Sequence, residues 1–255
     1  MNARLYPISM FSLFILIFSS CRETGSAPLT IATAANMQFA MKALTEDFTN
    51  KTGIECDLII GSSGKLTAQI KEGAPFDLFV SANMKYPQAI YEAGLANNFP
   101  EIYARGRLVL WTMSDKISPK IPSLSSRDIK HIALANPMTA PYGQAASEAL
   151  QYYDLLDEIS TKLVYGESIS QTNQFITSGS AELGFTAMSV VLSPQMKNKG
   201  KWIEIPSKTY SPINQGVILI KRNSTNGENA KKFYNFIFSD SAKEILKGFG
   251  YNVDE

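Results

Sequence analysis

The sequence is poor in the side chains that usually hold metal ions. Its 255 residues include one histidine and two cysteines, too few for a thiol or imidazole cluster around a metal. An excess of charge is also missing, since 24 basic and 23 acidic residues leave a formal net charge of +1. A large basic surface for nucleic acid is therefore not expected. Any anionic ligand must be held by local geometry and not by a general positive field.

The N-terminus has the pattern of a targeting segment. Residues 1–20 contain an early Arg4, then the apolar run MFSLFILIF and small residues before Cys21, which is typical of a secretory signal. The run is too short to span a bilayer as a permanent helix. The letters FSSC resemble a bacterial lipobox, in which the cysteine becomes the lipidated N-terminus, although Phe18 is less usual there than leucine. Plain secretion is the alternative. Residues 21–28 then form a short flexible tether.

The remaining cysteine and the histidine are expected to be structural. Cys56 lies inside a strand-like run, and a lipidated Cys21 leaves it no partner for a disulfide within the chain. It is expected to behave as a small buried hydrophobe. His131 opens the apolar run HIALAN and is interpreted as a residue at a strand end, not as a ligand.

Short β-rich runs alternate with helical patterns along the rest of the chain. In the first set, strands are expected at 29–35, 54–60 and 76–82, and helices at 36–53, 64–72 and 85–94. In the second set, strands are expected at 131–137, 162–166 and 182–188, and helices at 142–153 and 169–179. Further strand-like segments stand at 106–114, 201–206 and 214–222, and residues 228–250 look helical. This order predicts mainly parallel sheets covered by helices.

Two α/β units joined by strand-like segments predict two lobes with a ligand cleft between them. The expected bounds are 29–106 with 213–255 for the first lobe, and 107–212 for the second. The chain would cross near 104–108 and return near 207–215, with the helical tail packed back on the first lobe.

In open α/β sheets, ligands bind beyond the carboxyl ends of strands, at helix N-termini. This rule selects four turns of the chain, at 34–37, 61–64, 136–143 and 166–170.

The second of these turns begins the stretch GSSGKLT (61–67), which looks at first like a nucleotide loop. A Walker loop has four residues between its glycines and then Gly-Lys-Ser/Thr. Here only two residues separate Gly61 from Gly64, and Leu66 stands where the Mg²⁺-binding hydroxyl belongs. The loop is too short to wrap a diphosphate, so hydrolysis of a nucleoside triphosphate is disfavoured.

A smaller anion still suits this loop, because a helix start offers free N–H groups and the positive end of the helix dipole. Gly61 and Gly64 are expected to let the backbone turn these N–H groups inward. Ser62 and Ser63 add hydroxyl groups, and Lys65 is expected to face solvent. A serine that merely caps the helix is the structural alternative.

The other three turns are also rich in neutral donors. Asn36 can cap the helix that follows the first strand and offer its N–H. Tyr142, in the loop NPMTAPYGQ (136–144), can aim its hydroxyl into the cleft, with a packing role as the alternative. Ser168 or Ser170 is placed to cap a further helix. Four convergent helix starts can hold a small ionised oxyanion without a counter-ion, because many fixed dipoles offset the desolvation cost.

With these motifs in place, the sequence resembles the periplasmic molybdate-binding proteins of ABC importers. The resemblance covers residues 29–252, and its most specific block is SSGKLTAQIKEGAPFDLFVSA. It also rests on TIATAANMQFAMKAL, ARGRLVL, ANPMTAPYGQAASEAL, ELGF and FYNFIFSDSAKEILKGFGY. The resemblance implies a two-lobed type II binding-protein fold, with a mainly parallel sheet flanked by helices in each lobe, which closes over molybdate or tungstate.

Carried over by position, the resemblance assigns the ligand to five residues. Ala35 gives only its backbone, and Asn36 stands where much of the family has serine. Ser63 donates its hydroxyl and N–H. Tyr142 stands where other members use the N–H of a small residue, and Ile169 contributes an N–H at a helix start.

The sequence departs from the family at one position. Some members have a tyrosine donor just after the LGF-type strand, and Ala187 stands there in this chain. Tyr142 is the residue that can supply a phenol from the opposite side of the cleft. Without it, the site has one donor fewer.

The resemblance implies a solute-binding protein that captures its anion by hinge closure and delivers it to an ABC permease. It implies no catalytic residue and no cofactor, and the expected form is a monomer held by a lipid anchor on the outer face of a bacterial membrane. Sulfate or phosphate is the alternative ligand.

An organic carboxylate is disfavoured, because Arg105 and Arg107 lie at the lobe crossover and not at a helix start. An enzyme on the same scaffold is disfavoured, because Glu167 is the only general base in the four turns and is expected to be solvated.

Overall fold

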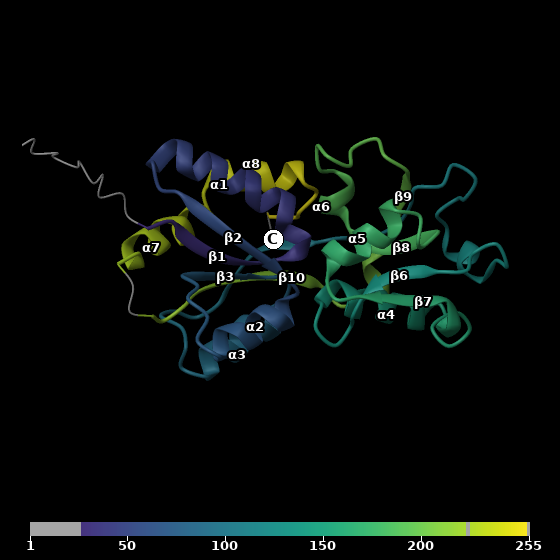
Figure 1. Cartoon of the computed structure of the whole chain (residues 1–255), viewed down its shortest axis with the longest axis horizontal. Helices are drawn as coiled ribbons and strands as arrows, with labels where there is room; N and C mark the ends of the chain where they lie inside the picture. Colours follow the sequence, from purple (N-terminus) through teal and green to yellow (C-terminus); the bar gives the residue numbers. More distant parts are fainter. Residues whose placement is uncertain (1–26, 223–224, 254–255) are drawn as a thin grey trace, which may run out of the picture.

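The computed structural model describes residues 27–222 and 225–253. The expected signal segment (1–20), the lipid attachment point Cys21 and most of the tether lie outside these residues. Two five-stranded sheets with their helices form two bodies, arranged one after the other along the long axis of the molecule (Figure 1). Across the described ranges, no helix combines the length and the apolar content that a bilayer crossing requires.

The first sheet, with its helices, is called lobe one. Its strand order is β2 (Cys56–Gly61), β1 (Leu29–Ala34), β3 (Leu78–Ser81), β10 (Ile213–Leu219) and β4 (Glu101–Gly106). β1 pairs in parallel with β2 and β3, whereas β10 runs antiparallel to both of its neighbours. Four of the five strands therefore point the same way, which confirms a mainly parallel sheet.

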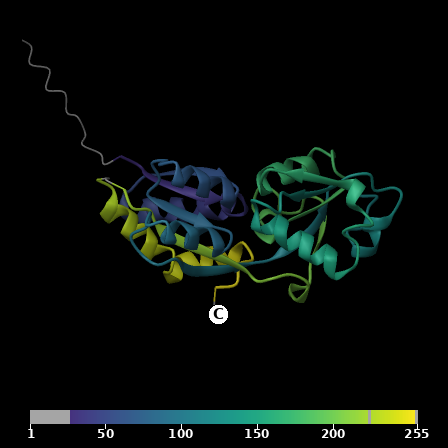
Figure 2. The ribbon, with the colours of Figure 1, turned by 90° about the horizontal axis from the view of Figure 1, so that it is seen from below.

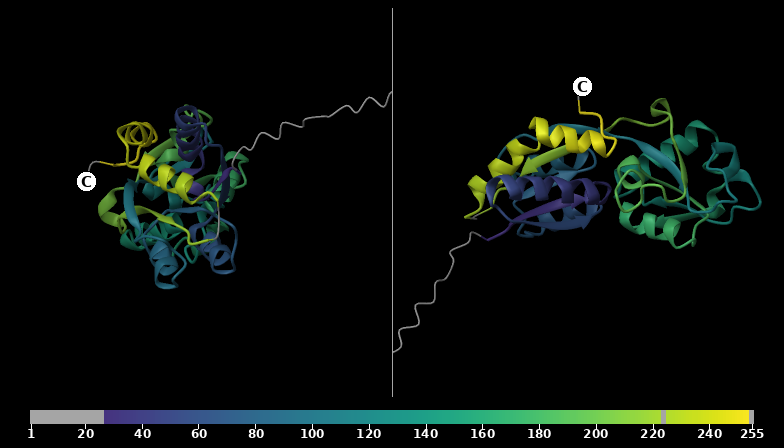
Figure 3. Two further views of the ribbon diagram at one scale, coloured as in Figure 1. Left: turned by 90° about the vertical axis from the view of Figure 1, so that its left-hand side faces the viewer. Right: turned by 90° about the horizontal axis from the view of Figure 1, so that it is seen from above.

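Helices cover both faces of this sheet (Figure 1). One apolar cluster joins the sheet to α1 (Gln38–Thr52), α7 (Gly227–Phe236) and α8 (Asp240–Gly248). A second joins it to α2 (Ser63–Lys71) and α3 (Lys85–Glu92). Figure 3 shows the yellow C-terminal helices packed along the purple N-terminal part of lobe one.

Helix α1 shows how the sequence pattern produces an element of this lobe. Its apolar residues Ala40, Leu44 and Phe48 recur every fourth position and are buried together against the sheet. Gly53 ends the helix with φ of 70°, a left-handed conformation that glycine adopts without steric cost.

The second sheet, with its helices, is called lobe two. Its strand order is β7 (Leu163–Gly166), β6 (Ile132–Ala135), β8 (Leu183–Ala187), β5 (Leu108–Thr112) and β9 (Lys201–Glu204). β5 is the strand that runs against its neighbours. α4 (Pro141–Tyr152), α5 (Ile169–Thr177) and the short α6 (Met188–Val191) pack on this sheet.

Narrow connections join the lobes (Figure 2). β4 ends at Gly106 in lobe one, and β5 begins at Leu108 in lobe two. The chain returns between the end of β9 at residue 204 and the start of β10 at residue 213.

The strand β4 and the helix α6 were not expected from the sequence. Cys56 is also less buried than expected, since it is half-buried with a free thiol.

Candidate functional site

A small cavity lies between the lobes, beyond the carboxyl ends of the parallel strands. Its volume is about 10 Å³, which is room for about one water-sized sphere. Its lining consists of ten residues from both lobes: Ala34, Ala35, Asn36, Ser62, Ser63, Ala82, Ala140, Pro141, Tyr142 and Ile169. All five predicted ligand residues are among them, and none of the ten carries a charged side chain.

The residues that line this cavity lie mainly at the starts of four helices. Asn36 lies in a short 3₁₀ helix (Ala35–Met37) that precedes α1. Ser63 and Ile169 are the first residues of α2 and α5, and Tyr142 follows Pro141 at the start of α4. The N–H groups of a first helical turn have no acceptor within their own helix. The cavity is therefore lined by backbone donors at the positive ends of helix dipoles.

The two serines of the second turn have different tasks. Ser62 is the N-cap of α2, and its Oγ accepts the N–H of Lys65 at 3.4 Å. The Oγ of Ser63 accepts the N–H of Ala82 at 3.0 Å, and this bond leaves its hydroxyl hydrogen available to a further acceptor. The capping role considered as an alternative thus belongs to Ser62, while Ser63 keeps a donor for the cavity.

The glycines of this turn are needed for a different reason than the sequence suggested. Gly61 and Gly64 are not among the residues with positive φ in the described chain. A Cβ atom on Gly64 would lie 3.0 Å from the Cα and the carbonyl oxygen of Thr139 in lobe two. The absence of a side chain at residue 64 therefore serves the close approach of the two lobes and not the shape of the turn.

Asn36 does not cap a helix with its side chain. Its Nδ2 atom donates to Oε1 of Gln215 at 2.8 Å and to the hydroxyl of Tyr251 at 2.9 Å. An amide nitrogen has two hydrogens, and both are thus used within the protein. What Asn36 can still donate to the cavity is its backbone N–H.

The hydroxyl of Tyr142 lies at the lobe crossover. A Cβ atom built on Gly106 would be 2.0 Å from it, and within the described chain this oxygen makes no hydrogen bond. Burial, followed by the neighbouring phenol of Tyr251, raises the pKa of Tyr142 well above its ordinary value. The phenol therefore stays neutral. Its position beside Gly106 favours the packing role that was considered as the alternative.

Direct contacts between the lobes surround the cavity. The N–H of Gly64 donates to the carbonyl of Thr139 at 2.9 Å, and the hydroxyl of Ser170 donates to Oε1 of Gln38 at 2.7 Å. Nearer the surface, the hydroxyl of Tyr86 donates to the carbonyl of Met138 at 3.2 Å. The two lobes are therefore in a closed arrangement.

An ion pair also bridges the lobes. The Nζ of Lys65 lies 2.5 Å from Oε1 of Glu167, and both side chains are more than half exposed, at 53% and 58%. Lys65 was expected to face solvent and Glu167 to be solvated. Both are indeed at the surface, but they meet across the cleft.

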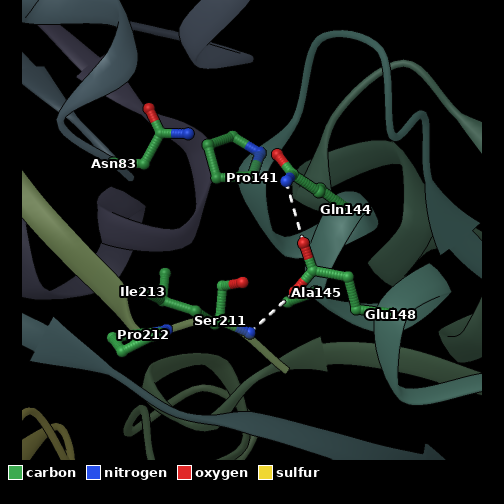
Figure 4. A pocket seen from close by; sticks show the side chains of 8 residues that line it. All are labelled: Asn83, Pro141, Gln144, Ala145, Glu148, Ser211, Pro212 and Ile213. Carbon is green, nitrogen blue, oxygen red and sulfur yellow. Dashed lines mark hydrogen bonds between the residues drawn. The ribbon is translucent and has the colours of Figure 1, made fainter. Parts of the chain in front are cut away.

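A neighbouring cavity of about 90 Å³ has a different character (Figure 4). The carboxylate of Glu148 lies in its wall, where it accepts the amide of Gln144 at 2.8 Å and the N–H of Ser211 at 2.6 Å. A carboxylate repels an anion. The smaller, uncharged cavity is thus the better candidate for an anion site.

A wider hollow of about 630 Å³ lies at the crossover, with Arg105, Arg107 and Lys208 in its wall. The guanidinium of Arg107 is 3.8 Å from Glu204, and Nε of Arg105 donates to Asn214 at 3.2 Å. No α-helix begins among the residues that line this hollow, although the three-residue 3₁₀ helix Ser207–Thr209 does. The two arginines lie where the sequence placed them, away from the four helix starts of the smaller cavity.

Three buried residues near the cavity were missed by the sequence analysis. Ser189 donates its hydroxyl to the carbonyl of Asn36 at 2.7 Å, and Gln215 and Tyr251 hold the amide of the same residue. Gln215 comes from β10 and Tyr251 from the C-terminal tail. Because these residues are far from Asn36 along the chain, their contacts with it cannot be read from the sequence. A polar residue within an otherwise apolar segment is nevertheless a signal of a buried hydrogen-bonded group.

The chain is similar to known proteins over most of its length. A family model described as bacterial extracellular solute-binding protein matches residues 29–252. The molybdate-binding protein ModA of Rhodobacter capsulatus is 34% identical over 237 residues, covering 92% of both chains. ModA of Azotobacter vinelandii is 33% identical over 230 residues, covering 89% of this chain and 91% of the relative.

A solved structure confirms the two-lobed fold. The periplasmic molybdate-binding protein of Azotobacter vinelandii superposes with a TM-score of 0.81 at 31% identity. The match covers 89% of this chain and 100% of the solved one.

Proposed function

We propose, since the chain belongs to the family of bacterial extracellular solute-binding proteins, that it captures molybdate and delivers it to an ABC permease. The observation that carries this proposal is the small cavity between the lobes, which has no charged side chain in its lining. Its lining brings helix starts from both lobes around one point. The two similar proteins of Rhodobacter and Azotobacter, both named as molybdate-binding, support the choice of ligand.

A cavity lined by neutral hydrogen-bond donors suits a fully ionised oxyanion. The ligand atoms would be held by the N–H groups of Ala35, Asn36, Ser63, Tyr142 and Ile169, and by the hydroxyl of Ser63. Within each lobe these donors are held at helix starts, so they replace the water shell of the anion with no rearrangement other than closure of the lobes. Tungstate has nearly the same size and charge, so the proposed site accepts it as well.

Binding would proceed by hinge closure. The proposed lobes are 29–106 with 213–255, and 107–212. Ala35, Asn36 and Ser63 lie in the first of them, and Tyr142 and Ile169 in the second. An anion that bonds to both lobes binds the closed form more tightly than the open one, and so shifts the population toward closure. The closed form is the one proposed to dock on the permease.

The rest of the proposal concerns the location and state of the protein. The protein acts as a monomer outside the cytoplasmic membrane, with Cys21 as the lipid attachment point that follows a signal segment at 1–20. It acts by binding, without a catalytic residue or a cofactor. Sulfate or phosphate is the competing ligand. A pocket fitted to the larger molybdate leaves its donors too far from the smaller sulfate.

Thermal unfolding of the mature protein tests the proposal. Molybdate, tungstate, sulfate, phosphate and ATP are added one at a time. A ligand at about 100 times its dissociation constant adds about 2.7 kcal/mol to the free energy of unfolding. Stabilisation by molybdate and tungstate alone is the expected result. Stabilisation by sulfate or phosphate alone would overturn the choice of ligand.

Two neighbouring serine variants then locate the site. A charge-assisted hydrogen bond is worth about 1.5–3 kcal/mol, so Ser63→Ala is expected to weaken molybdate binding roughly ten- to a hundredfold in calorimetric titration. Ser62→Ala is the matched control. It should lower the free energy of unfolding by about 1 kcal/mol through loss of the N-cap, with a much smaller effect on binding. An unchanged titration of Ser63→Ala would contradict the assignment.

A further inference from the structure

A buried polar cluster stands behind the proposed anion site. It is formed by Asn36, Gln215, Tyr251 and Ser189, which are all nearly inaccessible to solvent. Asn36 alone among these four lines the cavity. The cluster joins four separate parts of the chain: the first turn of lobe one, the strand β10, the C-terminal tail and the helix α6 of lobe two.

The orientation of Gln215 fixes the orientation of Asn36. The Nε2 atom of Gln215 donates to the carbonyl oxygens of Ala82 and Ile213, both at 3.2 Å. Only the nitrogen end of an amide can satisfy two carbonyl groups. The Oε1 atom of Gln215 must therefore point the other way, where it accepts the Nδ2 of Asn36 at 2.8 Å.

Tyr251 completes the restraint on Asn36. Its hydroxyl oxygen accepts the second hydrogen of Nδ2 at 2.9 Å. Its own hydrogen can be accepted by the carbonyl of Asn36 at 3.2 Å or by Oγ of Ser189 at 3.1 Å. Burial raises the pKa of Tyr251 to about 12, so the hydroxyl is present as a donor at neutral pH.

The restraint also reaches the backbone carbonyl of Asn36. The carbonyl of Asn36 also accepts the hydroxyl of Ser189 at 2.7 Å, across the boundary between the lobes. The carboxamide and the carbonyl of Asn36 are thus both held. The preceding peptide group, which carries the N–H of Asn36, is held as well, because the carbonyl of Ala35 accepts the N–H of Gln38. The backbone N–H of Asn36 is consequently fixed in direction, as electrostatic preorganisation of an anion site requires.

We propose that Gln215 and Tyr251 are positioning residues for anion binding, which hold Asn36 so that its N–H faces the bound oxyanion. Neither residue lines the cavity. Gln215 acts through the carboxamide of Asn36, and Tyr251 acts through the carboxamide and, with its hydroxyl hydrogen, the carbonyl of the same residue. This inference rests on the proposed function, since it concerns the same site. It adds that affinity depends on a residue of the C-terminal tail, distant from every ligand-binding turn in the sequence.

A double-mutant cycle tests the inference by calorimetric titration with molybdate. Tyr251→Phe is expected to weaken binding about tenfold in the wild-type background. In the Asn36→Ala background, where the carboxamide is absent, the same change should weaken binding by less than about threefold. The cycle isolates coupling through Asn36, which a general loss of stability would not produce. Gln215→Met should show the same dependence on background.

A matched control removes a different phenol. Tyr234 of α7 donates its hydroxyl to Glu101, away from the cluster. Tyr234→Phe is expected to leave the molybdate dissociation constant unchanged within about twofold.

The positioning role and the proposed function would be contradicted by different results. Equal fold-changes for Tyr251→Phe in both backgrounds would overturn the positioning role. Failure of the wild-type protein to bind molybdate would instead overturn the proposed function.

Discussion

The backbone N–H of Gly64 donates to the carbonyl of Thr139 at 2.9 Å, and this bond joins the α2 turn of lobe one to the loop before α4 of lobe two. The two turns also contribute Ser63 and Tyr142 to the cavity lining. The approach is so close that a Cβ on residue 64 would lie 3.0 Å from the Thr139 backbone. Closure of the lobes and formation of the site therefore depend on the same contact.

Gly64→Ala is expected to impair closure. The added methyl meets backbone atoms of the other lobe, and overpacking of this kind costs about 1–3 kcal/mol, or roughly five- to a hundredfold in molybdate affinity. Calorimetric titration measures the effect. Gly248→Ala is the control, because a Cβ there meets nothing within 4 Å. Wild-type affinity in Gly64→Ala would show that the lobes bind the anion without this contact.

The ion pair between Lys65 and Glu167 is expected to assist closure weakly. Both side chains are largely exposed, and exposed pairs contribute about 0.2–1 kcal/mol. Lys65→Gln should therefore raise the molybdate dissociation constant by at most about fivefold at low salt. Because salt screens exposed charges, the difference should disappear near 1 M NaCl. Glu167→Gln should have the same effect, and the double variant should add nothing. A large, salt-independent loss would instead indicate that Lys65 binds the anion directly.

Tyr142→Phe is expected to leave molybdate binding unchanged or to tighten it. The phenol makes no hydrogen bond within the described chain, and a buried polar group without a partner costs about 1–3 kcal/mol. In the proposed site Tyr142 contributes its N–H, so removal of the phenol takes no donor from the bound anion. Titration of the variant decides the matter. A loss of about tenfold or more would show that the phenol reaches the anion, as the sequence first suggested.

Stability is expected to fall at alkaline pH. Burial raises the pKa of Tyr251 to about 12 and that of Tyr142 well above its ordinary value. The unfolded chain ionises its tyrosines first, near pH 10. The contribution of these phenols to stability is thus complete below about pH 10 and is lost as pH rises toward the folded values. Denaturant unfolding at about pH 8, 9.5 and 11 measures this loss. Tyr251→Phe should make the decline shallower, and an equal decline would exclude a contribution from Tyr251.

Local patterns predicted most of the fold. The expected helices are present because they carry periodic apolar faces, as in α1. The central strands were recognised as short continuous apolar runs, as in β3 and β6, where every residue is buried. The strand β4 was missed because only two of its six residues, Tyr103 and Ala104, are buried, so it lacks a recognisable apolar pattern. Helix α6 has four residues, too few to show the helical period.

Features of the candidate site that depend on local sequence could be predicted, whereas those that depend on distant contacts could not. Ser63 and Ile169 line the cavity, as the sequence predicted, because a helix start after a strand is visible in the sequence. The direction of the Tyr142 phenol could not be predicted, since it depends on space beside Gly106 that tertiary packing creates. The role of Asn36 was predicted only in part. Its N–H follows from its position, whereas the loss of both amide hydrogens to Gln215 and Tyr251 requires contacts more than 170 residues away along the chain.

The position of β10 has a consequence for how the chain is assembled during synthesis. β10 pairs with both β3 and β4, so the first sheet remains in two pieces until residue 219 has been made. The strands of the second sheet all lie between residues 108 and 204, and this sheet can form earlier. Bringing residue 216 beside Ser81 also closes a long loop, which is a slow step in folding. The half of the protein that begins first is therefore the half that is completed last.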